Sequence, residues 1–536
     1  DGGITPQTFV VNITGTNDLP TITTTGADVT GAVTEDVAVV AATLTDTGTI
    51  TFNDLDLTNT HTVSVTRASG SLLGGTLTLG NVSEDATTTA GSVPWTYTIP
   101  TSATQYLALN QTASEVFTVI ISDGNGGTVT QNVTVTATGT NDAPTINTIV
   151  DTNLSEQTTT TALTTSIPVT FTDVDLTDIG HTASITGVVA SGITTGLALD
   201  QTALRALVTP GTVTKTSGSS SGSINMGFSA PATALDYLAA GEVLTLTYTV
   251  GLDDLDGGIT SQTFVVNITG TNDTPTITTT GADVTGAVTE DVAVVAATLT
   301  DTGTITFDDV DLTNTHTVFS VTRASGSLQG GTLTLGDVSE SATTTAGSVP
   351  WTYTIPTSAT QYLALNQTAS EVFTVTISDG NGGTVTQNVT VTATGTNDAP
   401  VINAITTTAL NEQTNTTALT TSIPVTFTDV DLTDISHAAS ITGVVASGIT
   451  TGLALSSSQL RDLVTPVSVT KTSGSSSGSI NMGFSAPATA LDYLAAGEVL
   501  TLTYTVDLND GDGGITSQTF VVNITGTNDT PTITTV

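Results

Sequence analysis

Acidic and amide side chains gather in two short loop motifs that recur along the chain. Phe-x-Asp-x-Asp occurs four times, with the acids Asp54 and Asp56, Asp173 and Asp175, Asp309 and Asp311, and Asp429 and Asp431. A Gly-Gly motif with two oxygen-bearing side chains also occurs four times, as Asp123 and Asn125, Asp254 and Asp256, Asp379 and Asn381, and Asp510 and Asp512. Carboxylates crowded in this way repel one another unless a cation neutralises them.

A third motif, Gly-Thr-Asn-Asp, marks the chain five times. It supplies Asn17 and Asp18, Asn141 and Asp142, Asn272 and Asp273, Asn397 and Asp398, and Asn528 and Asp529. Successive copies are 124, 131, 125 and 131 residues apart. A fixed period with a fixed boundary motif indicates a linear series of similar domains.

The repeats alternate between two types. Residues 20–144 recur at 275–400 with six substitutions and one inserted residue, Phe319, and the stretch between them recurs more loosely. We therefore expect repeats A1 at 19–142, B1 at 143–273, A2 at 274–398 and B2 at 399–529. Residues 1–18 should be the last strand of a truncated preceding repeat, and residues 530–536 the start of the next.

Strand signals dominate each repeat. Residues 8–14 and 129–136 alternate apolar and polar side chains with a period of two, and threonine suits the wetter face of a sheet. Short strands separated by frequent turns predict an all-β fold of antiparallel sandwiches. We place seven strands in A1, near 29–33, 39–52, 61–66, 75–79, 95–99, 116–122 and 128–138. Trp95 and Trp351 are read as core residues in preference to a ligand platform.

Alternating strand directions sort the acids onto two poles of each repeat. Both Asp motifs fall at the pole where the chain enters (the N-terminal pole), beside the Asn-Asp of the preceding linker. The opposite, C-terminal pole should carry two glutamates per repeat. These are Glu35 and Glu115, Glu156 and Glu242, Glu290 and Glu371, and Glu412 and Glu498.

Six to eight oxygen ligands should therefore meet at each junction, and this number fits Ca²⁺. Mg²⁺ requires a tighter octahedron, and zinc prefers nitrogen and sulfur, whereas the chain has no cysteine. Asp, Asn and Gly are also ordinary turn formers, but their recurrence at one predicted pole favours calcium. The four histidines, His61, His181, His316 and His437, follow the Asp-x-Asp motifs. We interpret them as hydrogen-bond partners of the loop.

Composition limits the possible partners. The chain has 48 acidic and 6 basic residues, for a net charge of −42. Nucleic acids and anionic membranes require basic surface, so we expect neither as a partner, and no apolar run is long enough to span a bilayer. The expected partners are calcium ions and neighbouring repeats of the same chain, which we expect to be a monomer.

Several of these motifs resemble the VCBS-type repeat of bacterial surface proteins. The resemblance is carried by residues 34–36, 52–56, 117–127 and 139–144, and it covers nearly the whole chain, although the B repeats depart from it at residues 254–258 and 217–223. It implies cadherin-like or immunoglobulin-like Greek-key sandwiches in an extended array. It also implies a large calcium-dependent adhesin that is exported by a type I system to the cell surface and serves attachment and biofilm formation.

Other functions remain open at this stage. One repeat type could itself bind a glycan or a protein, but nearly identical copies favour a spacer that projects an adhesive tip. An enzyme is disfavoured because no His-Glu-x-x-His, Gly-x-Ser-x-Gly or phosphate-loop motif is present. An ice-binding solenoid requires a much shorter period.

Overall fold

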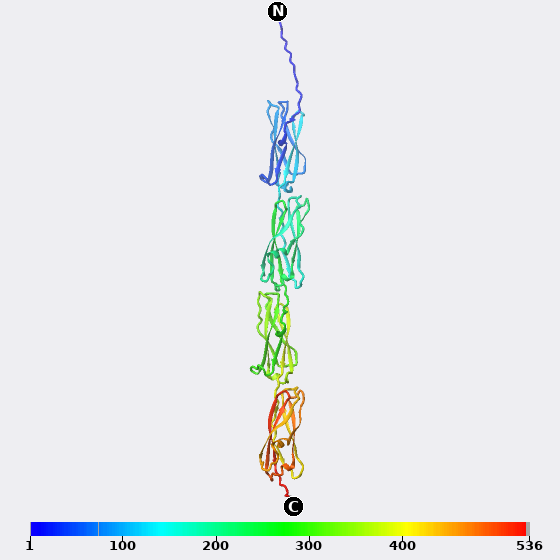
Figure 1. Cartoon of the computed structure of the whole chain (residues 1–536). Helices are drawn as coiled ribbons and strands as arrows, with labels where there is room; N and C mark the ends of the chain where they lie inside the picture. Colours follow the sequence, from blue (N-terminus) through cyan, green and yellow to red (C-terminus); the bar gives the residue numbers. More distant parts are fainter. Residues whose placement is uncertain (1, 73, 532–536) are drawn as a thin grey trace. The chain divides into compact units, whose positions relative to one another are not determined.

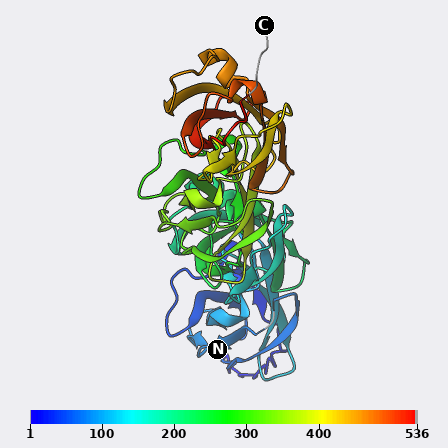
Figure 2. The same ribbon diagram turned by 90° about the horizontal axis from the view of Figure 1, so that it is seen from below.

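The computed structural model describes residues 2–72 and 74–531, whose regular secondary structure is almost entirely β-strand. The chain divides into two compact units, residues 1–271 and 272–536. Each unit holds two sandwiches, and we call them A1 and B1 in the first unit and A2 and B2 in the second. Figure 1 draws each sandwich as strands that lie side by side, and Figure 2 gives a second view of the same sandwiches.

The A sandwiches contain strands and short 3₁₀ turns. A1 comprises β1 (Thr21–Ile22), η1 (Gly26–Val29), β2 (Thr30–Thr34), β3 (Thr43–Asn53), β4 (Thr62–Gly70), β5 (Thr76–Leu79), β6 (Ser83–Glu84), β7 (Ala90–Pro100), η2 (Thr101–Ala103), β8 (Thr112–Ser122) and β9 (Thr128–Thr138). A2 comprises β19 (Thr276–Ile277), η4 (Gly281–Val284), β20 (Thr285–Thr289), β21 (Thr298–Asp308), β22 (Thr317–Gly326), β23 (Thr332–Leu335), β24 (Ala346–Pro356), η5 (Thr357–Ala359), β25 (Thr368–Ser378) and β26 (Thr384–Thr394).

The B sandwiches each add one short α-helix. B1 comprises β10 (Thr145–Ile146), β11 (Thr152–Ser155), β12 (Leu163–Thr172), β13 (Thr182–Gly192), α1 (Gln201–Ala206), β14 (Val208–Pro210), β15 (Thr214–Lys215), β16 (Ser221–Ala230), η3 (Ala232–Ala234), β17 (Val243–Asp253) and β18 (Ile259–Thr269). B2 comprises β27 (Val401–Ile402), β28 (Thr408–Asn411), β29 (Leu419–Thr428), β30 (Ala438–Gly448), α2 (Ser457–Arg461), β31 (Val464–Lys471), β32 (Ser477–Ala486), η6 (Ala488–Ala490), β33 (Val499–Asn509) and β34 (Ile515–Thr525).

Each sandwich pairs two sheets with the same topology. In A1 one sheet has the order β1-β3-β7-β5, with β6 also paired to β7, and the other has the order β2-β9-β8-β4. All pairs are antiparallel except β2 with β9, which run parallel. The chain therefore begins in one sheet at β1 and crosses to the other at β2, a parallel contact that the sequence did not predict.

The predicted alternation of side chains builds the core. Along β8 the inward residues include Phe117, Val119 and Ile121, each at most 4% exposed, while the outward positions hold threonines and serines together with Val116 and Ile120. Trp95 is 1% exposed, and its indole N–H donates to the backbone oxygen of Asp28 at 2.9 Å. The interpretation of this tryptophan as a core residue is confirmed.

The seven strands expected in A1 all form, at positions close to those predicted. The additional short strands β1 and β6 and the helices of the B sandwiches were not predicted. Residues 2–20 lie in no strand, so the strand expected within 1–18 is absent from the described residues. The expected start of a further repeat lies largely outside the described residues. Within the described part of the chain, no helix is long and apolar enough to cross a membrane.

Candidate metal-binding junctions

The Asn-Asp of each linker is held by both Asp motifs of the sandwich that follows it. In B1 the Asn141 amide donates to Oδ2 of Asp254 at 2.9 Å, and the backbone N–H of Asp142 donates to Oδ2 of Asp175 at 3.0 Å. The other three sandwiches repeat the pair of bonds: Asn17 to Asp123 and Asp18 to Asp56, Asn272 to Asp379 and Asp273 to Asp311, and Asn397 to Asp510 and Asp398 to Asp431. Both motifs therefore lie at the N-terminal pole.

The threonine of the Gly-Thr-Asn-Asp motif is held from the other side. Oε2 of Glu35 accepts the backbone N–H of Thr140 at 3.1 Å. The equivalent bonds join Glu156 to Thr271, Glu290 to Thr396, and Glu412 to Thr527. The recurring tetrapeptide thus presents one backbone N–H to the sandwich that precedes it, and an amide and a second N–H to the sandwich that follows it. This arrangement gives a physical reason for its fixed composition.

Carboxylates from A1 and B1 meet at the linker between them. We call Glu35, Asp36, Asn141, Asp142 and Asp175 the junction cluster. Three of its oxygens are buried and have no hydrogen-bond partner, namely Oδ1 of Asn141, Oδ2 of Asp142 and Oδ1 of Asp175. The side chains of Glu35 and Asp175 belong to residues that are 0% exposed. Buried oxygens without partners are costly, and a bound cation would satisfy them.

The pKa values of the carboxyl groups in the cluster also indicate that a cation would stabilise it. Burial raises the pKa of Glu35 to about 7, and the charges of Asp142, Asp36 and Asp175 add to the shift. Burial raises the pKa of Asp175 to about 6, with contributions from Asp173 and Asp142. The pKa of Asp142 is also raised, first by burial. A cation among these groups would remove the penalty that burial places on their charged forms.

The second unit contains the same cluster at its own A2–B2 linker. The unpartnered buried oxygens are Oδ1 of Asn397, Oδ2 of Asp398 and Oδ1 of Asp431. Burial raises the pKa of Glu290 to about 7 and that of Asp431 to about 6.

At the C-terminal poles of the A and B sandwiches, one acid and one glutamine exchange positions. In A1 the sequence is Glu35-Asp36, and a glutamine, Gln105, stands beside them and donates to both carboxylates at 2.9 and 3.2 Å. In B2 the sequence is Glu412-Gln413, and the position of Gln105 is taken by Asp492. Glu412, Asp492 and Asp529 each offer an oxygen within 4.8 Å of the others, so they form an acidic cluster that could hold a metal.

Sequence reasoning missed Asp36, Asp291, Asp236 and Asp492, because it considered glutamates alone at this pole. The exchange of Asp and Gln between two positions of the repeat is the sequence signal that could have identified these residues. Wherever a repeat has Asp after the first glutamate it has Gln in the later turn, and the reverse holds in the other repeat type.

Several predicted ligands have other partners. Glu115 was expected at the junction, but its oxygens accept hydrogen bonds from Nε of Arg67 at 3.0 Å and from the Tyr97 hydroxyl at 2.8 Å. Glu371 is held in the same way by Arg323 and Tyr353. In the B sandwiches, Oε2 of Glu242 and of Glu498 accepts the N–H of Ala239 and of Ala495, respectively. These contacts lie within single sandwiches, and the expectation that Glu115 and Glu371 reach across to the junction is wrong.

The first acid of each Asp motif shapes its own loop. Oδ1 of Asp254 accepts the N–H groups of Asp256 and Gly258, and a Cβ on Gly258 would lie 2.1 Å from Oδ2 of Asp254, which explains the glycine. Asp123, Asp379 and Asp510 make the same two bonds. The second position of the Gly-Gly motif is an asparagine in the A sandwiches, and the amides of Asn125 and Asn381 donate to Asn59 and Asn314, respectively. In the B sandwiches it is an exposed aspartate, Asp256 or Asp512.

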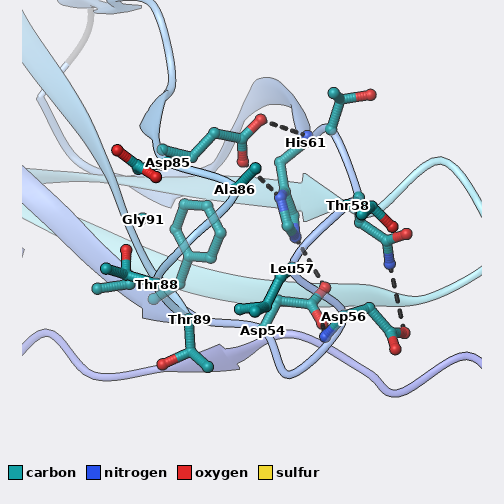
Figure 3. A pocket seen from close by; sticks show the side chains of 15 residues that line it. Asp54, Asp56, Leu57, Thr58, His61, Asp85, Ala86, Thr88, Thr89 and Gly91 are labelled. Atoms are coloured by element: carbon teal, nitrogen blue, oxygen red, sulfur yellow. Dashed lines mark hydrogen bonds and ion pairs between the residues drawn. The ribbon is translucent and has the colours of Figure 1, made fainter.

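The histidines lie against the first acid of Asp-x-Asp, as interpreted from the sequence. In A1, Nε2 of His61 lies 3.0 Å from Oδ2 of Asp54, and Nδ1 lies 2.7 Å from Oε2 of Glu84 (Figure 3). A cavity of about 220 Å³ adjoins them. In A2, burial opposes the charge on His316, but hydrogen bonds to Asp309 and Glu340 outweigh it and raise the His316 pKa. The equivalent contact in A2 joins His316 to Asp309 at 2.8 Å.

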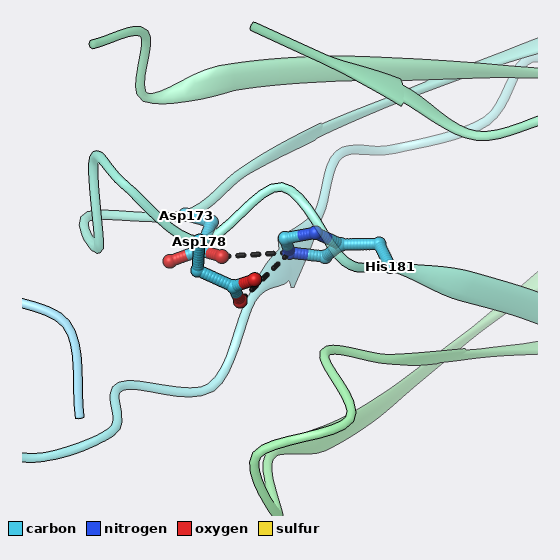
Figure 4. Close-up of side chains that lie close together, drawn as sticks. All are labelled: Asp173, Asp178 and His181. Carbon is cyan, nitrogen blue, oxygen red and sulfur yellow. Dashed lines mark hydrogen bonds and ion pairs between the residues drawn. The ribbon is translucent and has the colours of Figure 1, made fainter. Parts of the chain in front are cut away.

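In B1, His181 contacts Asp173 at 2.6 Å and lies 3.8 Å from Oδ2 of Asp178 (Figure 4). These three residues form a second acidic cluster with ligand atoms within 4.8 Å of one another, and Asp429, Asp434 and His437 form its copy in B2. The buried Lys215 also lies there, 3.4 Å from Oδ2 of Asp173. Sequence reasoning assigned no role to this lysine.

Direct contacts also join the two sandwiches of the first unit. The N–H of Leu176 donates to the backbone oxygen of Tyr106 at 3.2 Å, and the Thr177 hydroxyl donates to Oε1 of Gln111 at 2.7 Å. The second unit has the same pair of bonds, from Leu432 to Tyr362 and from Thr433 to Gln367.

No protein-family model matches the chain, and no curated protein matches it. Solved structures with a similar fold include cadherin domains 1–5 of protocadherin gamma B2, at 14% identity and a TM-score of 0.46, covering 96% of this chain and 82% of that one. The human desmocollin-1 ectodomain is similar at 12% identity and a TM-score of 0.24, covering 96% and 80%. Domains 22–24 of mouse cadherin-23 are similar at 14% identity and a TM-score of 0.31, covering 71% and 99%.

Proposed function

We propose that the chain binds Ca²⁺ at its junctions and acts as a non-enzymatic extender, which the ions stiffen. The observation that carries the proposal is the junction cluster, in which buried oxygens of Asn141, Asp142 and Asp175 lack any hydrogen-bond partner. These atoms belong to the linker and to B1, while Glu35 and Asp36 belong to A1. One ion bound to both sides would tie the two sandwiches and the linker together.

The donor set favours calcium over other metals. All the donors in the junction cluster are carboxylate or amide oxygens, which suit hard cations. Their number and their origin on three separate segments suit the flexible coordination of Ca²⁺ better than the tight octahedron of Mg²⁺. The ion would supply positive charge where burial disfavours the charged forms of Glu35, Asp142 and Asp175, and it would hold the junction in one geometry.

The wider biological setting follows from the sequence motifs. We propose that these repeats form an extended array in a large VCBS-type bacterial surface adhesin, secreted by a type I system, where they project an adhesive tip for attachment and biofilm formation. The array would work as a monomer outside the cell. The repeated clusters support this reading because a spacer needs many equivalent, lockable junctions.

Spin labels can test the proposed stiffening, because the chain has no cysteine and labels can be placed uniquely. Ser69 on β4 and Ser229 on β16 are exposed and lie in A1 and B1. With both replaced by cysteine and labelled, the distance distribution should be narrow in calcium and broad in chelator, while β circular dichroism is retained. Adding Asp142→Asn and Asp175→Asn should keep the distribution broad in calcium. If the width of the distance distribution in the parent chain is the same in calcium and in chelator, the proposal is contradicted.

A further inference from the structure

The chain has only two lysines, Lys215 and Lys471, and the side chains of both are fully buried in B sandwiches. Nζ of Lys215 donates to the backbone oxygens of Asp175 and Asp178 at 2.5 and 2.7 Å, and it lies 3.4 Å from Oδ2 of Asp173. Lys471 repeats the arrangement with Asp431, Asp434 and Asp429. A buried ammonium is stable only when it is paired and hydrogen-bonded in this way.

The oxygens around this ammonium resemble a cation site. Two backbone carbonyls and a carboxylate converge on Nζ, and they come from the Asp-x-Asp loop that also supplies Asp175 to the junction cluster. The ammonium group of the lysine therefore occupies a position where these oxygens could otherwise bind a metal ion.

The lysine is specific to the B sandwiches. Lys215 stands opposite Gly222 in the β15–β16 pair, and in A1 the residue opposite the equivalent Gly91 is Glu84. A lysine in one repeat type thus replaces a glutamate in the other. In A1 it is His61, between Asp54 and Glu84, that lies against the loop.

Few oxygens then remain for a bound ion at the A1–B1 junction. Both oxygens of Asp173 are engaged, because Oδ1 accepts the N–H of Asp175 and Oδ2 contacts His181 and Lys215. Both oxygens of Asp254 are engaged by its own loop and by Asn141. The unpartnered oxygens of the junction cluster belong to the linker and Asp175. One further buried oxygen without a hydrogen-bond partner, Oδ2 of Asp178, lies 3.8 Å from Nε2 of His181, in the loop whose backbone oxygens bind Lys215.

We infer that each A-to-B junction takes a single divalent ion, and that the ammonium of Lys215, or of Lys471 in the second unit, holds the place of a second one. This inference rests on the proposed calcium binding. It adds the number of ions and identifies the residue that limits it.

Counting the calcium bound by the full chain tests the inference, by equilibrium dialysis at saturating calcium. Asp175→Asn should lower the count by one, and Asp142→Asn combined with Asp175→Asn should also lower it by one. A loss of two ions in the double variant would show a second ion at that junction and overturn the one-ion assignment. Asp151→Asn is the matched control, because Asp151 is an exposed acid of B1 that belongs to neither Asp motif, and it should leave the count unchanged.

Lys215→Met tests the lysine directly, since methionine fills a similar volume without a charge. The count should rise by one in Lys215→Met and stay at the parent value in Lys215→Arg. An unchanged count in a folded Lys215→Met chain would overturn the role of the lysine. If that variant does not fold, Lys471→Met gives the same test in the second unit. A parent chain that binds no calcium would instead reject the proposed function, so the two failures are distinguishable.

Discussion

The backbone N–H of Asp142 donates to Oδ2 of Asp175 at 3.0 Å, while Oδ1 of the same carboxylate is buried without a partner. One oxygen of Asp175 therefore fixes the linker, and the other is left for a ligand. The Asp175 side chain thus has two roles, a hydrogen bond to the linker and an oxygen that is free for a ligand. The isosteric substitution Asp175→Asn can separate them.

Asp175→Asn should have opposite effects on stability with and without calcium. The amide keeps an oxygen for the Asp142 N–H but removes a charge from a crowded acidic cluster, so in chelator the melting temperature should rise by a few degrees. In calcium the same variant should melt below the parent chain, because the native state loses ion binding. Scanning calorimetry in both conditions measures this. A change of the same sign in both conditions would argue against Asp175 as a ligand.

Stability should also respond to pH in opposite directions in the two conditions. The pKa of folded Glu35 is about 7 against an ordinary 4.5, and that of Asp175 is about 6 against 3.8. A raised carboxyl pKa means that the folded state binds the proton more tightly. Without metal, this contribution to stability is complete below the ordinary values and is lost as pH rises through 6 to 7.

In chelator, the melting temperature should therefore fall between pH 5 and pH 8. In saturating calcium, this fall should be offset or reversed, since the ion competes with protons for the same oxygens. Melting curves at several pH values in chelator and in calcium check the difference. Identical pH profiles in the two series would show that Glu35 and Asp175 do not bind the ion.

The poles could be predicted from the sequence because they depend only on strand alternation. Once strands of period two were assigned, the loops after Phe52 and Ser122 had to share an end with Asn17. The individual partners could not be predicted in this way. Glu115 meets Arg67 because a register shift between Arg67 and Ser69 in the β4–β8 pair sets which side chains are neighbours. Lys215 becomes a buried cation through its pairing opposite Gly222, which strand patterns alone do not specify.

Glu115→Gln should destabilise A1 without changing calcium binding. Glu115 is 0% exposed and accepts hydrogen bonds from Arg67 and Tyr97, so its loss leaves a guanidinium without its counter-charge. We expect the free energy of unfolding to fall by about 1–3 kcal/mol. Water can reach Arg67, whose side chain is partly exposed, and this limits the loss. Denaturant unfolding and calcium counting on the same variant give the two readings. A lower calcium count would restore Glu115 as a ligand.

Gly48→Ala should destabilise A1 by overpacking the core tryptophan. Gly48 pairs with Trp95 across β3 and β7, and a Cβ at Gly48 would lie 2.5 Å from Cζ2 of the indole ring. The ring is buried and its N–H is already bonded to Asp28, so it cannot move aside freely. We expect a cost of about 1–3 kcal/mol.

The chain has only two tryptophans, so the substitution can be followed in one sandwich. In a Trp351→Phe background the fluorescence reports A1 alone, and the unfolding midpoint of A1 should fall in Gly48→Ala. In a Trp95→Phe background, Gly303→Ala changes the equivalent contact in A2, where the Cβ would also lie 2.5 Å from Trp351, and it should lower the A2 midpoint in the same way. If Gly48→Ala leaves the Trp95 midpoint unchanged, the indole has room beside Gly48, and this part of the core tolerates the added methyl group.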